Sequence, residues 1–508
     1  MSRTDGIAVL LCLVAVIAAG FVAQDVFENM AHLEDEFAYV WQAQVIARGD
    51  LTIPSPEHPQ SFLVPFVIDY QGQRFGKYPL GWPAVLSLGV SLGVRSWVNP
   101  LLAGLAIWLI YRLGQAVFNR SVGLLAAGLS LTSPFFLINA GSLLSHLWSL
   151  VLSTIFILSW LEGISEKGKT EHPWLAAAVS GLSLGLLGLT RPLTMVAVGI
   201  PFGIQGLVIL FRGDSPVRRR IWLVGGLAFS LGLLHFIWQY AVTGDFTQNP
   251  YTLWWSYDKL GFGPGYGVTR EGHNLQQAWW NTKHSLRVGA SDLFGWGKIS
   301  WLFVPWGIWA VRKKPETYLL LGVPITLILG YGFYWVGSWL IGPRYYFEAL
   351  PALALLSAAG ISWLAGWPLG KERPFSPPCG WQRLRSGLTA AAVGIFVGAN
   401  LLCYLPLRME SLQGLYTIER SDLEPFQGEK VRELTPALII VHSDPWMSYG
   451  SLLEFTDPYQ QSAFLFAWSL SPRKDAELAK TFQSARDVYH YYPDVEPWVL
   501  YTAPLPEG

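Results

Sequence analysis

The sequence predicts an all-α, polytopic membrane protein that ends in a small α/β domain outside the membrane. The chain of 508 residues is 52% hydrophobic and only 14% charged, whereas about 25% of the residues of a soluble domain are charged. Long apolar runs recur, and the 25 Trp, 21 Tyr and 27 Phe are typical of helices anchored at a membrane surface. The net charge is zero, so we expect no nucleic-acid partner.

Eleven segments are long and apolar enough to be spanning helices, because a helix needs about 20 mostly apolar residues to cross a bilayer. The first, 6–23, follows a basic residue and is expected to remain as an uncleaved helix. The others are 97–118, 122–140, 143–161, 174–190, 193–211, 220–238, 296–311, 317–336, 345–366 and 387–406. Segment 79–94 is shorter and has prolines near its start, so we expect it to lie at the outer interface.

The Lys and Arg residues of the short loops predict the orientation, because cytoplasmic loops carry an excess of positive charge. If 79–94 does not span, one side holds Arg3 and most of the basic loop residues, at 112–120, 167–169, 212–220, 312–314 and 371–385. The opposite short loops hold only Arg191 and Arg344. We therefore expect a multi-pass protein of the inner (plasma) membrane with a cytoplasmic N-terminus.

This orientation divides the chain into a membrane domain, residues 1–406, and an extracytoplasmic α/β domain, residues 407–508. Two long loops of the membrane domain, 24–96 and 239–295, then lie on the same outer side as the tail. In the tail, residues 475–485 form an amphipathic pattern typical of a helix. The segments typical of strands are 438–443, 464–470, 487–493 and 498–502.

Three consecutive acids, Glu34, Asp35 and Glu36, begin a helix-like segment of the first outer loop. One interpretation is structural, since acids at a helix N-terminus are stabilised by the helix dipole. The other is a general base or a metal site at the membrane surface, where a low dielectric strengthens interactions between charges. Both interpretations are open from these residues alone.

Lys77 lies directly before segment 79–94. Its long side chain could anchor that segment by extending to the headgroups, or it could contact the phosphate of a lipid-linked substrate. Loop 239–295 is rich in Gly and aromatic residues. It lacks the strand and helix that flank a nucleotide-binding loop, so its rings are expected either to stack on a sugar or to pack the loop.

Arg191 and Arg344 are basic residues in outer loops, against the general trend, and each needs an anionic partner. That partner could be a substrate headgroup, an acid of loop 24–96 or, for Arg344, Glu348 one turn later. Neither Lys77 nor Arg344 has an acid adjacent in sequence, so we expect both to face a substrate anion. The prediction is one phosphate-binding cavity, formed by Lys77, Arg344, Tyr345 and Arg191.

His146 lies at the outer end of the fourth span, in the segment SLLSHLWSLVL. A single histidine in an apolar helix is usually a packing residue, but this one is expected at the same depth as Asp35. A metal site is the alternative, with Glu36 as a further ligand. A divalent metal ion is therefore the one cofactor that the sequence predicts.

Together these residues resemble the GT-C type of polyprenyl-phosphate-sugar-dependent glycosyltransferases. Within that type the chain is similar to the bacterial relatives of protein O-mannosyltransferases and of the lipid A aminoarabinose transferase. The resemblance rests on Asp35-Glu36 and Tyr39, on GDLTIP (49–54), on Lys77-Tyr78-Pro79, and on the apolar segments NPLLAGLAIWLIYRLGQAVF and LLAAGLSLTSPFFL. It is good over residues 5–210, weaker to 366 and absent in the tail.

The resemblance implies a GT-C-like membrane domain that transfers a hexose or pentose, with inversion, from a polyprenyl-phosphate donor at the outer leaflet. The acceptor would be a glycan, a lipid or a protein. The resemblance also implies that Asp35 is the base and that Lys77 contacts the donor phosphate; Glu36 would orient the base or help to bind a metal. The chain departs from the aminoarabinose transferase at Gly76 and at Ser145-His146, where that enzyme has acids.

A secondary transporter or a flippase of lipid-linked substrates is the main alternative. Such proteins place polar residues near the bilayer midplane, often in repeated halves. Here the acids cluster in an outer loop and the sequence has no duplicated half, which favours the enzyme. A non-catalytic assembly or polymer-binding protein is a further alternative, and it would not need Asp35 in an outer pocket.

Overall fold

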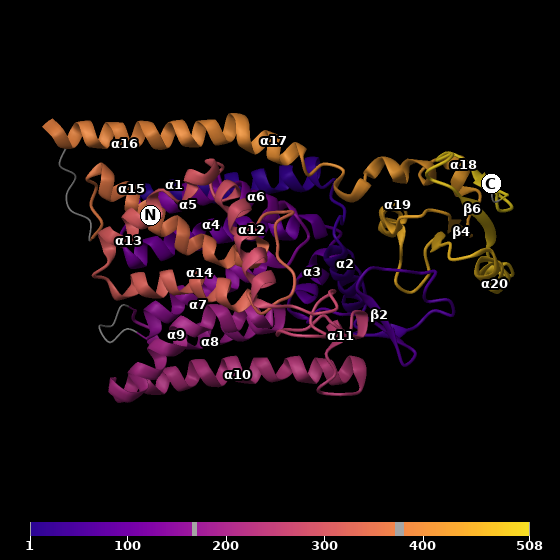
Figure 1. The fold of residues 1–508 in the computed structure, drawn as a ribbon, viewed down its shortest axis with the longest axis horizontal. Helices are drawn as coiled ribbons and strands as arrows, with labels where there is room; N and C mark the ends of the chain where they lie inside the picture. The colour runs from indigo at the N-terminus through magenta and orange to yellow at the C-terminus, as the bar shows by residue number, and fades with distance from the viewer. Residues whose placement is uncertain (1, 165–169, 371–379, 507–508) are drawn as a thin grey trace.

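The computed structural model describes residues 2–164, 170–370 and 380–506. Within them, long helices run side by side in a bundle, and a smaller α/β unit lies at one end (Figure 1). Four of the basic residues that predicted the orientation lie outside the described residues: Lys167, Lys169, Lys371 and Arg373.

The first half of the chain contributes most of the bundle. Its elements are α1 (Arg3–Phe21), which continues as η1 (Val22–Val26), α2 (Glu34–Ala47), α3 (Gly81–Ser91), η2 (Arg95–Trp97), α4 (Val98–Val117), α5 (Arg120–Leu131), α6 (Pro134–Gly141), α7 (His146–Gly163), α8 (Pro173–Thr190), α9 (Pro192–Arg212) and α10 (Ser215–Thr243). The second half adds α11 (Pro250–Trp254), α12 (Leu275–Asp292), η3 (Gly297–Trp301), α13 (Phe303–Val311), α14 (Pro315–Tyr331), η4 (Arg344–Ala349), α15 (Leu350–Ala365), α16 (Gly380–Ala399), η5 (Asn400–Tyr404) and α17 (Leu405–Glu410).

Eight helical stretches of the described residues are long and apolar enough to cross a membrane, or nine if the bent pair α5–α6 forms one span. This supports a polytopic membrane protein but gives fewer spans than the eleven predicted. The predicted span 122–140 bends by 63° between α5 and α6. The bend follows from Ser133 and Pro134, because Ser133 caps the new helix and proline favours its first turn.

Two further predicted spans are interrupted or short. Segment 296–311 is divided into η3 and α13. Gly295, before η3, and Gly297, its first residue, have φ of 70° and 60°, a conformation that glycine adopts without strain. Helix α14 has only 17 residues and ends at Tyr331. The residues after it, which the sequence assigned to a span, leave the helix and line a cavity.

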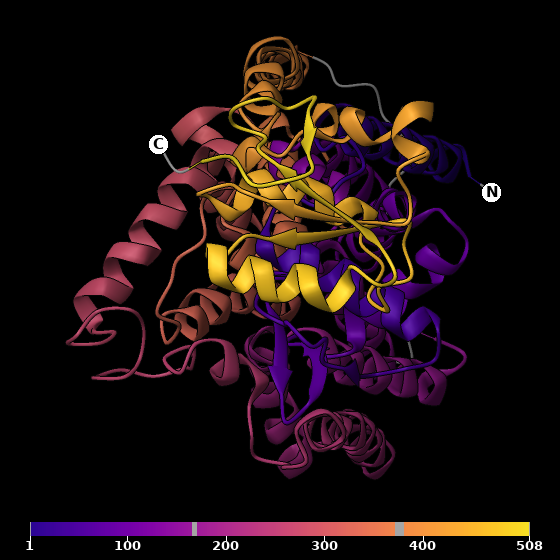
Figure 2. The same cartoon turned by 90° about the vertical axis from the view of Figure 1, so that its right-hand side faces the viewer.

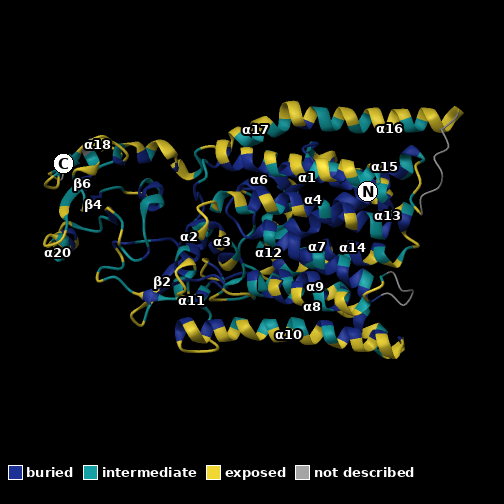
Figure 3. Ribbon diagram, turned by 180° about the vertical axis from the view of Figure 1, so that it is seen from behind, coloured by how far each residue is buried: buried dark blue, intermediate teal, exposed yellow. Residues whose placement is uncertain are grey.

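Helices α10 and α16 lie along opposite edges of the bundle (Figure 1) and are exposed over most of their length (Figure 3). Their exposed side chains are large and apolar, for example Phe229 on α10 and Ile395 on α16. Such continuous apolar surface is typical of contact with lipid. In contrast, nearly every residue of α15 is buried, so this helix forms part of the centre of the bundle.

The first outer loop contains a small antiparallel sheet, β1 (Ile53–Pro54), β2 (Val67–Tyr70) and β3 (Gln73–Gly76), in the order β1-β3-β2. Strands β2 and β3 are joined by a tight turn at Gln71-Gly72, where both residues have positive φ, as a two-residue hairpin requires. Because β3 ends at Gly76, the hairpin fixes the position of the next residue, Lys77.

The tail forms a four-stranded sheet in the order β5-β4-β6-β7. Its elements are η6 (Leu415–Thr417), η7 (Arg420–Phe426), α18 (Glu429–Arg432), β4 (Ala437–Val441), α19 (Trp446–Gly450), η8 (Ser451–Phe455), β5 (Phe464–Trp468), α20 (Pro472–Phe482), β6 (Asp487–Tyr491) and β7 (Leu500–Tyr501). The central strand β4 pairs in parallel with β5 and β6.

The tail contacts the first outer loop. The amide of Trp468 donates to the carbonyl of Ser61 at 2.7 Å, and Arg48 lies 3.1 Å from Asp457. Figure 2, which shows the molecule from this end, has the sheet and α20 in front of the helix bundle. The tail and both long outer loops therefore share one end of the molecule.

Candidate functional site

A cavity of about 440 Å³ lies where these outer segments meet the helices. Its wall comes from the first turns of α2, the segment after β3, the ends of α7, α8 and α9, loop 239–295 and residues 331–345. Six of the predicted site residues line it: Asp35, Lys77, His146, Arg191, Arg344 and Tyr345. Glu36 is not among the lining residues.

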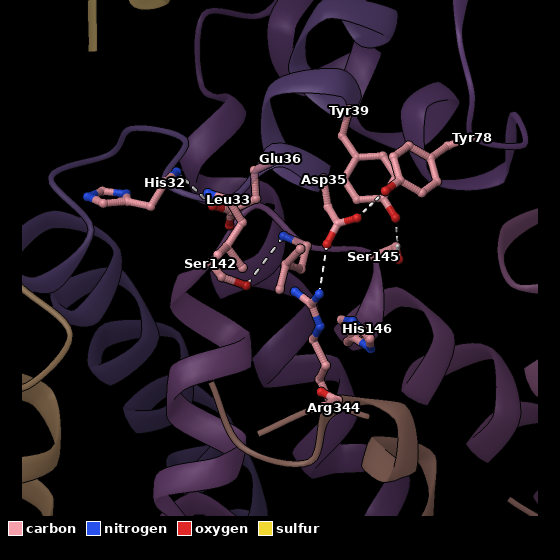
Figure 4. Close-up of polar contacts among 12 residues, drawn as sticks. His32, Leu33, Asp35, Glu36, Tyr39, Tyr78, Ser142, Ser145, His146 and Arg344 are labelled. Carbon is pink, nitrogen blue, oxygen red and sulfur yellow. Dashed lines mark hydrogen bonds and ion pairs between the residues drawn. The ribbon is translucent and has the colours of Figure 1, made fainter. Parts of the chain in front are cut away.

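Asp35 lies in the first turn of α2 and makes two polar contacts in the cavity (Figure 4). One carboxylate oxygen is 2.9 Å from the guanidinium of Arg344, and the other accepts a hydrogen bond from the hydroxyl of Tyr78. Burial opposes ionisation, but the positive charges of Arg344 and Lys77 outweigh it and lower the pKa of Asp35. Asp35 is therefore a carboxylate at neutral pH, able to accept a proton.

Glu36 has a structural environment. One of its oxygens accepts from the amides of His32 and Leu33 at 2.9 and 3.1 Å, and the other accepts from the amide of Leu143 at 2.7 Å. Its side chain is 2% exposed and points away from Asp35 (Figure 4). These bonds cap α2 and join it to the turn before α7.

Glu34, the first acid of the run, also lines the cavity beside Asp35. No other described residue forms a hydrogen bond or an ion pair with its carboxylate, which bonds only its own backbone amide. Burial raises the pKa of this carboxyl above its usual range. The sequence analysis assigned no role to Glu34, because spacing alone does not show which of three adjacent acids turns inward.

Lys77 is buried, and its ammonium lies 3.3 Å from the carboxylate of Asp258. The same ammonium lies 3.4 Å from the ring centre of Phe66, a favourable contact between a cation and an aromatic face. Asp258 also accepts from Tyr334 and Trp335 at 2.7 and 3.1 Å. Burial lowers the pKa of Lys77, although Asp258 opposes this effect.

Arg191 and Arg344 are both engaged with protein groups. Arg191 contacts Nε2 of His146 at 3.0 Å, the hydroxyl of Tyr331 at 2.8 Å and, more distantly, Glu348 at 3.9 Å. The pairing of Arg344 with Glu348 is therefore wrong, because Arg344 pairs with Asp35. Of the partners that the sequence left open for Arg344, the structure has an acid of loop 24–96, Asp35. Lys77 also has an acidic partner, Asp258, which is distant in sequence.

Tyr345 lines the cavity beside Arg344. Its ring stacks on that of Tyr331, with centres 4.7 Å apart and planes 9° apart. Tyr331 in turn binds Arg191, so the two tyrosines connect the two arginines along one wall. The cavity thus holds three cations and several acids in contact, an arrangement that an added anion would have to rearrange.

The fold is similar to that of known membrane glycosyltransferases. ArnT from Cupriavidus metallidurans in the apo state has a TM-score of 0.57 and 14% sequence identity, over 96% of this chain and 89% of ArnT. ArnT bound to undecaprenyl phosphate has a TM-score of 0.56 and 13% identity, over 97% and 93% of the two chains. The chain has a GT-C fold. This confirms the fold that the sequence resemblance implied.

A more distant GT-C structure is the oligosaccharyltransferase AglB from Archaeoglobus fulgidus, in complex with an inhibitory peptide and a dolichol-phosphate. It has a TM-score of 0.50 and 12% identity, and the match covers 90% of this chain but 64% of AglB. No protein-family model matches the sequence, and neither does any curated protein. At these identities the similarity defines the fold alone.

The departure at Gly76 from the expected GT-C pattern has a steric reason. A Cβ atom added at Gly76 would lie 2.3 Å from Cδ of Gln42, so a side chain fits there only if the end of Gln42 moves. Gln42 holds this segment by donating to the carbonyl of Tyr78 at 2.8 Å. At the second departure, Ser145 bonds Tyr39 at 3.2 Å.

The residues predicted to hold a metal do not fit one. His146 accepts from the guanidinium of Arg191 at Nε2, because a guanidinium only donates, and Glu36 accepts three amides outside the cavity. In the part of the chain that the structure describes, no group of three or more His, Cys, Asp or Glu side chains could hold a metal ion.

Sequence reasoning missed Asp258, Tyr78 and Tyr331 as parts of this site. Asp258 follows the Trp-Trp-Ser-Tyr run of loop 239–295, which was considered only for stacking or packing. Tyr78 was quoted only as part of the resemblance, and Tyr331 was assigned to the predicted span 317–336. Its position directly after the aromatic run is the one signal in the sequence that distinguishes Asp258 from the other acids of this loop, Asp245, Glu271 and Asp292.

Proposed function

We propose that this protein is a membrane glycosyltransferase that moves a sugar from a polyprenyl-phosphate donor to an acceptor outside the inner membrane, with inversion. The observation that carries the proposal is the 2.9 Å contact between Asp35 and Arg344, which pairs a carboxylate base with a guanidinium suited to phosphate. The lipid phosphates named for the ArnT and AglB structures support such a ligand for this fold.

When the donor binds, its phosphate replaces the acids of the cavity as the partner of Arg344 and Lys77. Arg344 can bind phosphate through two parallel N–H groups, whereas Lys77 acts as a point charge. When the phosphate pairs with Arg344, the carboxylate of Asp35 loses the positive neighbour that lowers its pKa. Donor binding therefore makes Asp35 a stronger base at the moment when an acceptor needs one.

In the transfer step, an oxygen of the acceptor attacks the anomeric carbon on the face opposite the phosphate. The bond between that carbon and the phosphate oxygen breaks, and its electron pair stays on the lipid phosphate. Asp35 takes the proton of the acceptor hydroxyl. Lys77, Arg191 and Arg344 stabilise the negative charge that develops on the phosphate.

The orientation belongs to the same proposal. A cytoplasmic N-terminus puts the cavity and the tail on the outer side of the inner membrane, at headgroup depth. The polyprenyl chain then lies among the lipid-facing helices while its phosphate reaches the cavity. The donor sugar is a hexose or a pentose, and the acceptor is a glycan, a lipid or a protein.

The test uses the full chain in lipid vesicles, with polyprenyl-phosphate sugars that are labelled in the sugar. Asp35→Asn should lower sugar transfer by about 10²–10⁴-fold, the usual effect of removing a general base, and should still capture undecaprenyl phosphate. Arg344→Ala should weaken that capture, but not the binding of polyprenol without a phosphate. Asp444→Asn, at an exposed position of the tail, is the matched control and should change neither measurement.

Near-normal turnover of Asp35→Asn would contradict its role as the base. If Arg344→Ala weakened the binding of polyprenol and of undecaprenyl phosphate equally, the arginine would support the fold and would not bind the donor phosphate. Movement of intact donor across the vesicle, with no release or transfer of sugar, would contradict the enzyme and favour a flippase.

A further inference from the structure

A second cavity, of about 620 Å³, adjoins the first. Three residues, Glu34, Phe66 and Trp255, line both cavities, so the two are neighbours across a shared wall. The second cavity also reaches Trp254 of α11 and Trp446 of α19. Its wall is therefore built jointly by the first outer loop, loop 239–295 and the tail.

The aromatic side chains of this wall are held by edge contacts. The ring of Phe66 packs against Trp254 and Trp255, with centres 5.6 and 5.2 Å apart and planes at 84°. Trp446 packs edge-on against Phe37 of α2, at 5.8 Å. Trp254 and Trp446 are only partly buried, so flat ring surface remains available to the cavity.

The polar groups of the wall are mainly hydrogen-bond acceptors. The carboxylate of Glu34 has no partner on another described residue and lies at the junction of the two cavities. Asp69 is 3.7 Å from the buried guanidinium of Arg74, which leaves its other oxygen lone pairs free. Since carboxylates only accept, a ligand that binds Glu34 or Asp69 has to donate hydrogen bonds. The wall also offers a donor, the Nε of Arg74, which has no hydrogen-bond partner within the described residues.

Flat aromatic faces together with a few placed acceptors match the chemistry of a saccharide. A sugar ring has an apolar C–H face that can lie on an indole, and hydroxyl groups at its edge that donate to carboxylates. An anionic ligand would meet two carboxylates, Glu34 and Asp69, and one guanidinium, Arg74, which already faces Asp69. A wholly apolar ligand would cover the half-buried carboxylate of Glu34 and give it no partner, which costs free energy.

We propose that the second cavity binds the saccharide part of the acceptor, stacked on Trp446 and Trp254, with Glu34 accepting a hydrogen bond from it beside Asp35. The acceptor role rests on the proposed function, whereas saccharide binding can be measured without it. The tail domain would then take part in acceptor binding, because it contributes Trp446 to the wall of the cavity.

The test measures binding of fluorescently labelled cellotriose, chitotriose and mannotriose to the full chain in detergent, with the tripeptide Ala-Ser-Thr as the comparison. We expect at least one saccharide to bind and the tripeptide not to. Trp446→Ala should weaken saccharide binding by about tenfold, as for the loss of one stacking contact. Trp446→Phe keeps a flat ring and should retain most of the binding, and Glu34→Gln should also weaken it.

Trp498→Ala is the matched control, because Trp498 is an exposed tryptophan of the same domain, 67% accessible to solvent. Capture of undecaprenyl phosphate, measured on the same samples, should not change in Trp446→Ala.

Saccharide binding that is absent at millimolar concentration, or equal in Trp446→Ala and wild type, overturns the inference. Tripeptide binding that depends on Trp446 overturns it in favour of a peptide acceptor. If undecaprenyl phosphate is not captured but Trp446-dependent saccharide binding persists, the proposed donor chemistry fails and the saccharide site stands.

Discussion

Glu34, Asp35 and Glu36 are adjacent in the chain but occupy three different environments. Asp35 pairs with a guanidinium in the first cavity, Glu36 accepts three backbone amides, and Glu34 has no partner on another described residue. Successive residues of a helix point about 100° apart, so this difference follows from the helix. The sequence could predict that an acid of this run faces the site, but not which one, because the orientation of α2 depends on distant contacts.

Glu36→Gln should lower the stability of the folded protein, whereas donor capture and sugar transfer should change little. An amide side chain has one acceptor oxygen, and its NH₂ group would face backbone N–H groups, so at least one buried amide loses its partner. The expected loss is about 1–3 kcal/mol of unfolding free energy, seen as a lower thermal midpoint in detergent. Donor capture by the folded variant should be close to that of wild type. Unchanged stability together with lost turnover would instead make Glu36 part of the reaction.

Capture of a lipid phosphate should depend on pH through Lys77. Burial lowers the pKa of this lysine, so its ammonium loses its proton at a lower pH than the usual value of about 10.4. The phosphate is fully ionised well above its second pKa of about 6. Undecaprenyl phosphate capture should therefore weaken as the pH rises from about 8 to 10. Lys77→Arg, which stays protonated, should remove this dependence, and an equal decline in both proteins would exclude Lys77 as its cause.

Metal dependence can be tested against the donor set around Asp35. Its partners are a guanidinium and a phenol hydroxyl, neither of which is a usual ligand for a divalent ion. We therefore expect turnover to survive a chelator and extensive dialysis, with added Mg²⁺, Mn²⁺ or Zn²⁺ changing the rate by less than about twofold. Loss of activity on chelation, restored by one of these ions, would support the metal that the sequence predicted.

At the scale of elements, the hairpin β2–β3 determines where Lys77 lies. Its register pairs Val67 with Gly76 and Ile68 with Phe75, and Gly76 packs against Gln42 of α2. The start of α2 was predictable from its acids, whereas the hairpin was not, because its strands are only four residues long. The contact between Gly76 and Gln42 joins two elements that carry site residues.

Gly76→Ala tests this contact. The new Cβ would lie 2.3 Å from Gln42, so either β3 moves and displaces Lys77, or Gln42 moves and loses its bond to the carbonyl of Tyr78, which holds the segment of Lys77. A displacement of about 1 Å can lower a rate by about 10²-fold, and we expect a loss of sugar transfer of that order. The double variant Gly76→Ala/Gln42→Ala should recover part of the rate. Gly128→Ala, where no atom lies within 4 Å, is the control, and no recovery in the double variant would contradict the steric explanation.

At the scale of the whole molecule, hydropathy predicted the long spans and the resemblance implied the GT-C fold. Hydropathy could not predict the bend between α5 and α6 or the early end of α14. Bent or short helices that are buried inside a protein are as apolar as straight spanning helices. The tail was expected to be α/β from alternating and amphipathic patterns. The cavities were beyond prediction, since each is built by segments that are far apart in the sequence.

The orientation of the molecule depends on α3. This helix has 11 residues, about 16 Å at a rise of 1.5 Å per residue, whereas the hydrocarbon core is about 30 Å thick. If α3 does not cross, the first outer loop, loop 239–295 and the tail lie on one side. If it crossed, every later loop would change sides, and Asp35 and Asp258 could not meet in one cavity.

Single cysteines test this orientation in a chain whose Cys12, Cys379 and Cys403 are replaced by serine. Exposed positions that should react with an impermeant maleimide on intact cells are Glu57, Arg270 and Arg473. Lys313, in the short loop between α13 and α14, should react only after permeabilisation. Reaction at Glu57 without reaction at Arg270 would mean that the chain crosses the membrane an odd number of times between them. That result would contradict the structure as well as the charge rule, because the cavity needs Asp35 and Asp258 on the same side.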